Sequence, residues 1–168
     1  MSKVESTPEM ATAMYSKMDE RLKIIRKRLN RPLTLADKIL YGHVDDPENQ
    51  PLEPGKSQLF LRPDRVVLQD VLGQSAFLQF MQTRRSSVAV PTSVDCDHLI
   101  QARTGATSDL KESIAENGEI YDFLKSAAPK FGAGFWGPAA AIIHQVVIEQ
   151  YAFPAHMIIG TDSHTPNA

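Results

Sequence analysis

Three short polar stretches carry the side chains of this sequence that could do chemistry. Asp97 and His98 are adjacent, and a carboxylate beside an imidazole can fix the ring tautomer and raise its basicity, as general acid–base catalysis requires. The same two residues can equally be hydrophilic loop residues. Asp162, Ser163 and His164 place an acceptor, a hydroxyl and an imidazole within three positions. No nucleophile elbow accompanies them, so the sequence does not indicate a serine triad, and a turn or capping motif is the alternative.

A further histidine, His144, lies in an otherwise apolar stretch over residues 142–147. It can be a site residue, or a core histidine with a satisfied hydrogen bond. Together, His98, His144, Asp162 and His164 are ligand types that suit zinc or iron. Their spacing is not that of a zinc finger, which counts against a metal site. A mononuclear metal site is nevertheless kept as an alternative.

Short apolar strands alternating with amphipathic helices must position these residues. Met14, Met18 and Leu22 recur at helical spacing and predict a helix over residues 10–29. We expect further helices over 34–41, 71–82 and 140–151 and from Ser108 onward, strands over 59–61, 66–68, 88–90 and 157–159, and a glycine-rich turn over 132–138. This alternation predicts an α/β fold, a parallel sheet with helices on its faces. Ligands of such sheets bind outside the carboxyl ends of the strands, where the polar stretches fall.

The composition is that of one ordinary domain of 168 residues, with a net charge of −2 and a single cysteine, Cys96. One cysteine excludes an internal disulfide framework and an all-cysteine metal site. We expect no membrane span, since no apolar run approaches the roughly 18 residues that one needs. Residues 1–10 contain two glutamates and no apolar block, which is unlike a secretory signal.

Charge is uneven along the chain, because residues 1–31 carry a net charge of +4 on a body that is acidic overall. Such a basic helical arm can contact RNA, an anionic lipid or another acidic surface. The alternative is a solvated helix face. The sequence pI near 6.2 gives little support to nucleic-acid binding by the chain as a whole.

Several motifs resemble the N-terminal region of the aconitase family. They are residues 25–43 (IRKRLNRPLTLADKILYGH), 61–66 (LRPDRV), 96–100 (CDHLI), 134–136 (GFW), 142–145 (IIHQ) and 160–167 (GTDSHTPN). The last motif is specific for the aconitase and isopropylmalate isomerase superfamily. The resemblance implies a three-layer parallel-sheet domain like the first domain of aconitase over residues 32–168, preceded by a helical arm over residues 1–31.

The resemblance also implies an activity, the isomerisation of citrate to isocitrate through cis-aconitate on a [4Fe–4S] cluster. Carried over by position, Asp97 and His98 would protonate the leaving hydroxyl. Hydroxide is a poor leaving group, so it needs a proton donor beside a Lewis acid. The resemblance further implies that Gln74 contacts substrate, that His144 pairs with Asp162, and that Asp162, Ser163 and His164 line the substrate pocket.

Other features depart from the family. Its three cluster cysteines, its base serine and its substrate-binding arginines would lie beyond the equivalent of residue 168. We therefore expect no cofactor to be bound by this chain alone, with a [4Fe–4S] cluster possible only if another chain completes the site. Asp95 stands where the family usually has histidine, and Gly137 where it has a basic or polar residue. The alanines of residues 138–141 replace a glycine-rich turn whose glycines can take positive φ.

Two functions compete for this sequence. In the first, the chain is a truncated, catalytically silent aconitase-like protein that acts as a structural or interaction subunit, with other protein subunits covering its exposed surfaces. In the second, it is the N-terminal part of a genuine or split aconitase completed by another polypeptide, and only then does it bind citrate, isocitrate and cis-aconitate. Under either function, we expect the chain not to be a free monomer. The family occurs in the mitochondrial matrix, our first expectation for the compartment, and in the bacterial cytoplasm.

Overall fold

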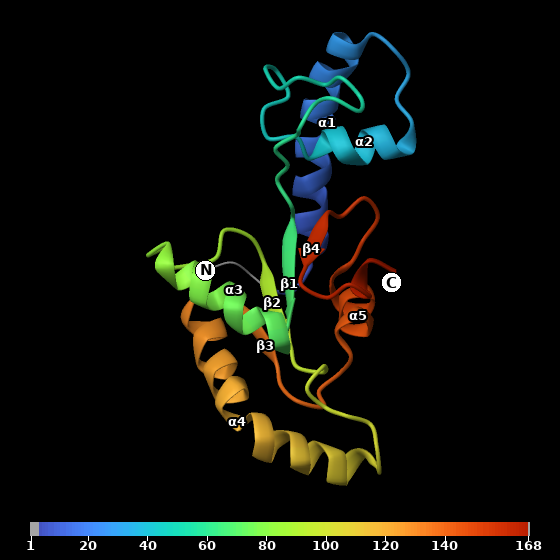
Figure 1. Ribbon diagram of the computed structural model, residues 1–168. Helices are drawn as coiled ribbons and strands as arrows, with labels where there is room; N and C mark the ends of the chain where they lie inside the picture. Colours follow the sequence, from blue (N-terminus) through green and yellow to red (C-terminus); the bar gives the residue numbers. More distant parts are fainter. Residues whose placement is uncertain (1–3, 168) are drawn as a thin grey trace. The chain divides into compact units, whose positions relative to one another are not determined.

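The computed structural model describes residues 4–167 as two compact units (Figure 1). The sheet unit comprises residues 65–152 and 158–167 together with residues 4 and 5. The helical unit comprises residues 6–64 and 153–157. The domain boundary that the sequence predicts after residue 31 stays a prediction. Among the described residues, no helix is both long and apolar enough to cross a membrane.

Helix α1 (Pro8–Leu29) is the longest element of the helical unit and confirms the predicted helix. The Thr7 side chain caps it by accepting a hydrogen bond from the Met10 amide at 3.3 Å. Asn30 ends it in the left-handed conformation, with φ of 47°. The buried face is the predicted one, formed by Met14, Met18, Leu22 and Ile25.

Helix α2 (Leu35–Gly42) begins with a capping box between Thr34 and Asp37. His43 follows directly and is buried. Its Nδ1 donates to the Ile39 carbonyl and its Nε2 to the Asp64 carboxylate, both at 2.7 Å. Burial opposes the charge of this ring, but both hydrogen bonds favour it and the pKa of His43 is raised.

The strand predicted over residues 59–61 is wrong. Leu61 forms only an isolated antiparallel bridge with Val44. The amide of Phe60 donates to the Gln50 side chain, and its carbonyl accepts from the Asp45 amide. A loop side chain therefore satisfies the backbone that a neighbouring strand would otherwise pair with.

The sheet unit is built on four parallel strands in the order β3-β2-β1-β4, which confirms the predicted parallel sheet (Figure 1). The strands are β1 (Arg65–Gln69), β2 (Thr92–Asp95), β3 (Gly134–Trp136) and β4 (Ile158–Gly160). In the register, Gln69 lies beside Asp95 and Val67 beside Gly160. Since all four strands are parallel, their carboxyl ends meet at one edge of the sheet.

Helices cover both faces of this sheet, which gives the expected three layers. They are α3 (Asp70–Gln82) and α4 (Ala106–Lys130) on one face, and α5 (Ile143–Val146) with the π-helical turn η1 (Val147–Tyr151) on the other. Side chains alternate along a strand. Leu68 accordingly packs into the core beneath α3 and α4, whereas Val67 packs against α5 and η1.

Strand β2 corrects the strand predicted over residues 88–90, because it begins at Thr92, after Pro91 rather than before it. The Val66 amide donates to the Pro91 carbonyl at 3.0 Å, so pairing with β1 starts at the proline. All four residues of β2 are buried although three are polar. Hydrophobicity alone could not locate such a strand, and the consequence is that Asp97 and His98 almost directly follow it.

The predicted helix over residues 140–151 is also shorter than expected. Ala139 takes a φ of 62°, in the left-handed region that alanine rarely adopts. Regular helix begins only at Ile143 and widens into η1 after four residues. The start of this helix is therefore set by the turn before it.

Two further boundaries differ from the prediction. Strand β3 lies inside the predicted glycine-rich turn over 132–138. Helix α4 begins at Ala106 rather than at Ser108. The Asp109 carboxylate accepts hydrogen bonds from the amides of Arg103, Thr104 and Gly105, so a residue inside the first turn organises the start of this helix.

Candidate active site

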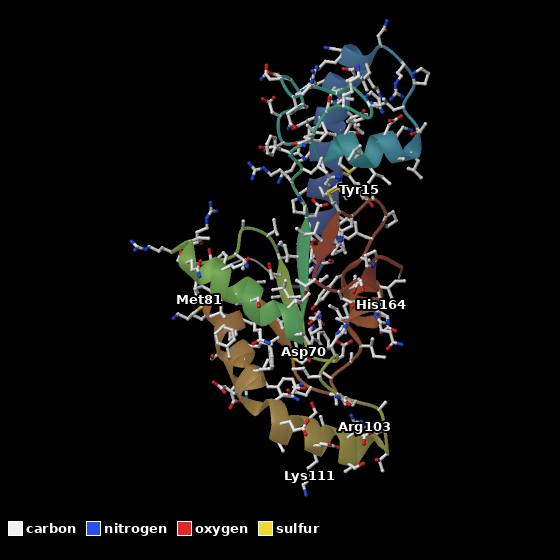
Figure 2. The ribbon with its side chains drawn as sticks, in the orientation of Figure 1. Tyr15, Asp70, Met81, Arg103, Lys111 and His164 are labelled. Carbon is white, nitrogen blue, oxygen red and sulfur yellow. The ribbon has the colours of Figure 1, made fainter. Side chains whose placement is uncertain are left out.

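The predicted polar residues gather at the carboxyl edge of the sheet. The loop after β4 is fastened to β1, because Thr161 Oγ1 accepts from the Gln69 amide and the Thr161 amide donates to Val67. Figure 2 shows Asp70, directly after β1, and His164, after β4, at this end of the sheet unit. The topology therefore brings together residues that are more than 60 positions apart in the sequence, His98 and Asp162 among them.

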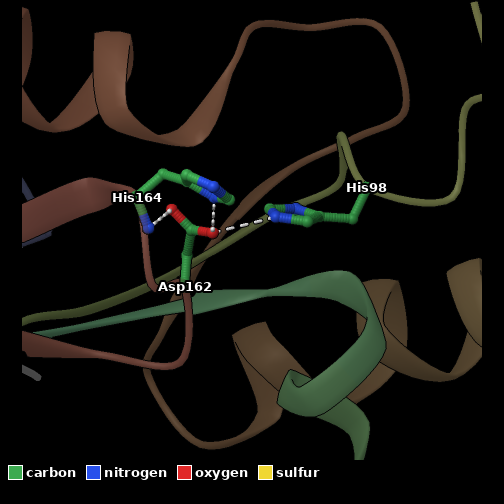
Figure 3. A group of neighbouring side chains, drawn as sticks. All are labelled: His98, Asp162 and His164. Carbon is green, nitrogen blue, oxygen red and sulfur yellow. Dashed lines mark hydrogen bonds and ion pairs between the residues drawn. The ribbon is translucent and has the colours of Figure 1, made fainter.

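His98 lies between the carboxylates of Asp97 and Asp162, and Figure 3 shows its contact with Asp162. Its Nδ1 is 2.7 Å from Asp97 Oδ1, and its Nε2 is 2.9 Å from Asp162 Oδ1. Since carboxylates only accept, both ring nitrogens donate and the ring is an imidazolium. Partial burial opposes this charge, but the hydrogen bonds to Asp97 and Asp162 outweigh it and raise the pKa of His98. The side chain is 30% exposed, so solvent and small molecules can reach it.

Asp162 is held rigidly in this arrangement. Its Oδ2 accepts from the amide and the hydroxyl of Thr165, both at 2.7 Å, and from the His164 amide at 3.2 Å. Burial opposes ionisation, but these hydrogen bonds and that from His98 lower the pKa of Asp162 to about 2. The carboxylate is therefore charged near neutral pH and presents Oδ1 toward the histidines.

Two more histidines approach Asp162. His164 Nδ1 lies 3.5 Å from Oδ1, and its side chain is 76% exposed. His144 Nδ1 lies 4.0 Å from Oδ2. His144 and Asp162 thus lie near each other without a hydrogen bond between them, and the pairing that the family resemblance implies stays a prediction.

Asp97 is positioned by the start of α5. Its Oδ2 accepts a hydrogen bond from the Ile143 amide at 2.9 Å, while its Oδ1 faces His98. The Ile143 amide is one of the free N–H groups at the first turn of a helix. The first turn of α5 therefore fixes the carboxylate that orients the imidazole.

Asp70 also supports His98, through the backbone. Its carboxylate is fully buried and accepts from the amides of His98 and Leu99 at 3.3 and 3.2 Å. Burial raises the pKa of Asp70. The sequence alone gave Asp70 no role, because a carboxylate that holds a distant loop leaves no local pattern.

Two predicted residues lie apart from this arrangement. The Gln74 amide donates to the Val71 carbonyl within α3. Gln74 lines a hollow of about 340 Å³ with Leu78, Glu119, Ile120 and Phe123. Ser163 is exposed. Neither residue hydrogen-bonds His98 or Asp162 in the described part of the chain, and their substrate-binding roles stay predictions.

The described residues do not fit an iron–sulfur cluster. Such clusters are held by several thiolates, whereas Cys96 is the one cysteine of the chain. Cys96 is 1% exposed and packs in the core beneath α3 and α4, where burial raises the pKa of its thiol. A buried neutral thiol on the face opposite α5 is not a cluster ligand.

Asp95 is a buried carboxylate behind the site. It lies at the end of β2, fully buried, and accepts a hydrogen bond from Ser93 at 3.1 Å. Burial raises the pKa of Asp95 to about 7. Arg65 is also fully buried, with its guanidinium 3.9 Å from the centre of the Tyr151 ring. The positive charge of Arg65 acts against the effect of burial and favours the ionised form of Asp95.

Comparisons with known proteins decide the family. The family model described as the aconitase family (aconitate hydratase) matches residues 37–168. The chain belongs to the aconitase family. A mitochondrial aconitate hydratase from Gracilaria gracilis is 54% identical over all 168 residues. That of Saccharomyces cerevisiae is 58% identical over 154 residues, 92% of this chain.

The matches cover most or all of this chain but only a small part of each relative. The matched region is 21% of the Gracilaria protein and 20% of the Saccharomyces protein. A probable mitochondrial aconitate hydratase of Caenorhabditis elegans is 51% identical over 153 residues, again 20% of its length. The chain thus spans about a fifth of the length of the aconitases it matches.

Proposed function

We propose that this chain supplies the proton-donor part of an aconitate hydratase active site. The observation that carries the proposal is His98, whose two ring nitrogens lie 2.7 and 2.9 Å from the carboxylates of Asp97 and Asp162. The substrates would be citrate, isocitrate and cis-aconitate, as the family resemblance implies, and the relatives named aconitate hydratase support this assignment. Those relatives are named mitochondrial, which supports the mitochondrial matrix as the compartment.

In the proposed reaction, His98 protonates the leaving hydroxyl group. When the C–O bond breaks, its electron pair stays on oxygen, and that oxygen takes the proton from His98 Nε2 and leaves as water. Asp97 keeps the ring oriented through Nδ1 and Asp162 stabilises the charged form. Rehydration runs the same steps backward. The base that removes the C–H proton and the thiolates that hold the family's cluster would come from outside residues 4–167.

The raised pKa suits this role. A proton donor must be protonated at the working pH and still release its proton in the transition state. With its pKa raised above the usual value near 6.5, His98 keeps its proton to a higher pH than a free histidine does. Deprotonation at higher pH would remove the donor, so activity should fall on the alkaline side.

A chimera tests the proposal. This chain would replace the matching fifth of the Saccharomyces aconitate hydratase, which is 58% identical to it, and hydration of cis-aconitate would be measured beside the absorbance of the cluster. We expect an active chimera that His98→Gln inactivates. A chimera with a loaded cluster but no hydratase activity would overturn the proposal, and so would an active chimera that His98→Gln leaves unchanged.

The second candidate is a catalytically silent subunit of a larger assembly. The observation that favours it is the buried Cys96, which leaves the described residues without a cluster ligand. Ile142, Ile148 and Ile159 are each 43–54% exposed on the sheet unit, and other protein subunits could cover them. The same chimera separates the candidates, because a silent subunit yields a folded, cluster-loaded and inactive protein.

A further inference from the structure

We propose that His98, Asp162 and His164 form a binding site for one divalent transition-metal ion, with Zn²⁺ as the reference ion. This site differs from the family's iron–sulfur cluster, because it uses imidazole and carboxylate ligands of this chain and no thiolate. It does not rest on the proposed hydratase function, since binding can be measured on the chain itself.

The three ligand atoms already lie close to the arrangement that an ion requires. One nitrogen from each histidine and one oxygen of Asp162 all lie within 4.8 Å of one another. His98 Nε2 is 2.9 Å and His164 Nδ1 is 3.5 Å from Asp162 Oδ1 (Figure 3). Tetrahedral zinc with bonds of about 2.0–2.1 Å separates its ligands by about 3.3 Å. The two separations from Asp162 Oδ1 are within a few tenths of an ångström of this value. The two ring nitrogens lie within 4.8 Å of each other, so an ion would draw them closer by up to about 1.5 Å.

The surrounding hydrogen bonds hold two of the ligands in the orientation that metal binding needs. Histidine ligands of zinc commonly donate their other ring N–H to a carboxylate. Asp97 accepts from His98 Nδ1 at 2.7 Å, which leaves Nε2 as the ligand atom once the ion displaces the Nε2 proton to solvent. Asp162 Oδ2 is occupied by Thr165, which leaves Oδ1 for the ion.

The site is open on one side and has a fourth nitrogen nearby. The His164 side chain is 76% exposed, so a water molecule can complete four-coordination, as in sites with three protein ligands. His144 Nδ1 is buried, makes no hydrogen bond and lies 4.0 Å from Asp162 Oδ2. A rotation of that ring would offer a fourth protein ligand.

The ligand types select the class of metal. Two imidazoles and one carboxylate suit zinc and other late divalent ions, whereas Mg²⁺ and Ca²⁺ prefer oxygen ligands. A second cluster, Asp70 with Asp97 and His98, is also compact. It is a weaker candidate, because Asp70 is fully buried and its oxygens already accept backbone amides.

Calorimetry on the full chain tests the site with ZnCl₂ as the probe and MgCl₂ as the comparison. We expect one Zn²⁺ per chain and no binding of Mg²⁺ at the same concentration. His164→Gln should lower the affinity for Zn²⁺ at least about tenfold, and Asp97→Asn about 10- to 100-fold. His164 is largely exposed, so the first variant keeps its fold. His156→Gln is the matched control, since it removes a histidine of the helical unit and should leave the affinity unchanged.

Three results would overturn the proposal. One is the absence of Zn²⁺ binding by the folded chain. Another is an affinity that His164→Gln leaves unchanged or that His156→Gln lowers. The third is a sulfur-to-cobalt charge-transfer band when Co²⁺ replaces Zn²⁺, because that band would make Cys96 a ligand. Loss of hydratase activity in the chimera with Zn²⁺ binding intact would refute only the proposed function.

Discussion

His43 in the helical unit and His98 in the sheet unit each hydrogen-bond an aspartate, and their surroundings differ. His43, in the helical unit, is 1% exposed and donates to the Ile39 carbonyl and to Asp64. His98, in the sheet unit, is 30% exposed and lies between two carboxylates. The pKa is raised in both rings, against the effect of burial. A raised pKa alone therefore does not separate a structural histidine from a catalytic candidate.

The two histidines differ in the exposure of their side chains and in the further hydrogen bonds that their aspartate partners make. Asp64 also accepts from the Met157 amide, so the His43 pair joins segments of the helical unit. A buried ring of this kind has no route to a substrate and contributes to stability. His98 keeps an exposed side and is held by carboxylates that are themselves anchored to α5 and to the loop after β4. Rigid support around an open imidazole is what acid catalysis or metal binding needs.

The largest expected effect concerns chemistry at His98. In the chimera, His98→Gln should lower kcat for cis-aconitate hydration by about 10²–10⁴-fold, the range that one general acid supplies. His43→Gln should lower the yield of folded protein but leave kcat of the folded fraction within a few-fold. Steady-state kinetics normalised to cluster content measures both. Equal losses of kcat in the two variants would contradict the assignment of a catalytic role to His98 and a structural role to His43.

The next effect concerns stability, where we expect His43→Gln to cost more than His98→Gln, the opposite of their order for kcat. His43→Gln should lower the free energy of unfolding by about 1.5–3 kcal/mol, because it removes hydrogen bonds of a buried charged group and leaves Asp64 short of a partner. His98→Gln should cost less, since its site is partly hydrated. Urea unfolding followed by circular dichroism compares the two. A greater loss in His98→Gln than in His43→Gln would contradict the structural role of His43.

A pH titration separates the two rings directly. The folded pKa of each histidine is raised, so its stabilising charge is complete below the unfolded value near 6.5 and is lost as pH rises through the folded value. Asp97→Asn should lower the titration midpoint of His98 and leave that of His43 in place. Proton–nitrogen NMR of the imidazoles follows both midpoints in one sample. An unmoved His98 midpoint would mean that Asp97 does not set its charge.

The smallest effect concerns the turn before α5. Ala139 has a φ of 62°, and glycine tolerates this conformation better, so Ala139→Gly should stabilise the chain by about 0.5–1 kcal/mol after the added entropy of the unfolded state. Ala140→Gly is the matched control, because Ala140 is not among the residues with positive φ, and it should be neutral or destabilising. Thermal unfolding measures both variants. A stabilisation by Ala140→Gly equal to that of Ala139→Gly would remove the link to backbone conformation.

Sequence patterns predicted the parallel sheet and placed the polar stretches at the carboxyl ends of its strands, because parallel strands carry the residues that follow them to one edge. They did not locate β2, since Thr92, Ser93 and Asp95 are polar and yet buried. They also could not find the amide of Ile143 that holds Asp97, because backbone donors have no sequence identity. The sequence also could not show that His43 is buried while His98 is partly exposed, because this difference arises only from tertiary packing.

The position of Cys96 has a practical consequence. The thiolate is the reactive form of cysteine, and this thiol is 1% exposed with a raised pKa. Alkylating reagents and oxidants should therefore leave the folded chain unmodified and react only when the core beneath α3 and α4 opens. The rate at which this single cysteine is modified therefore reports how often the sheet unit opens. Mass spectrometry can measure that rate without an engineered label.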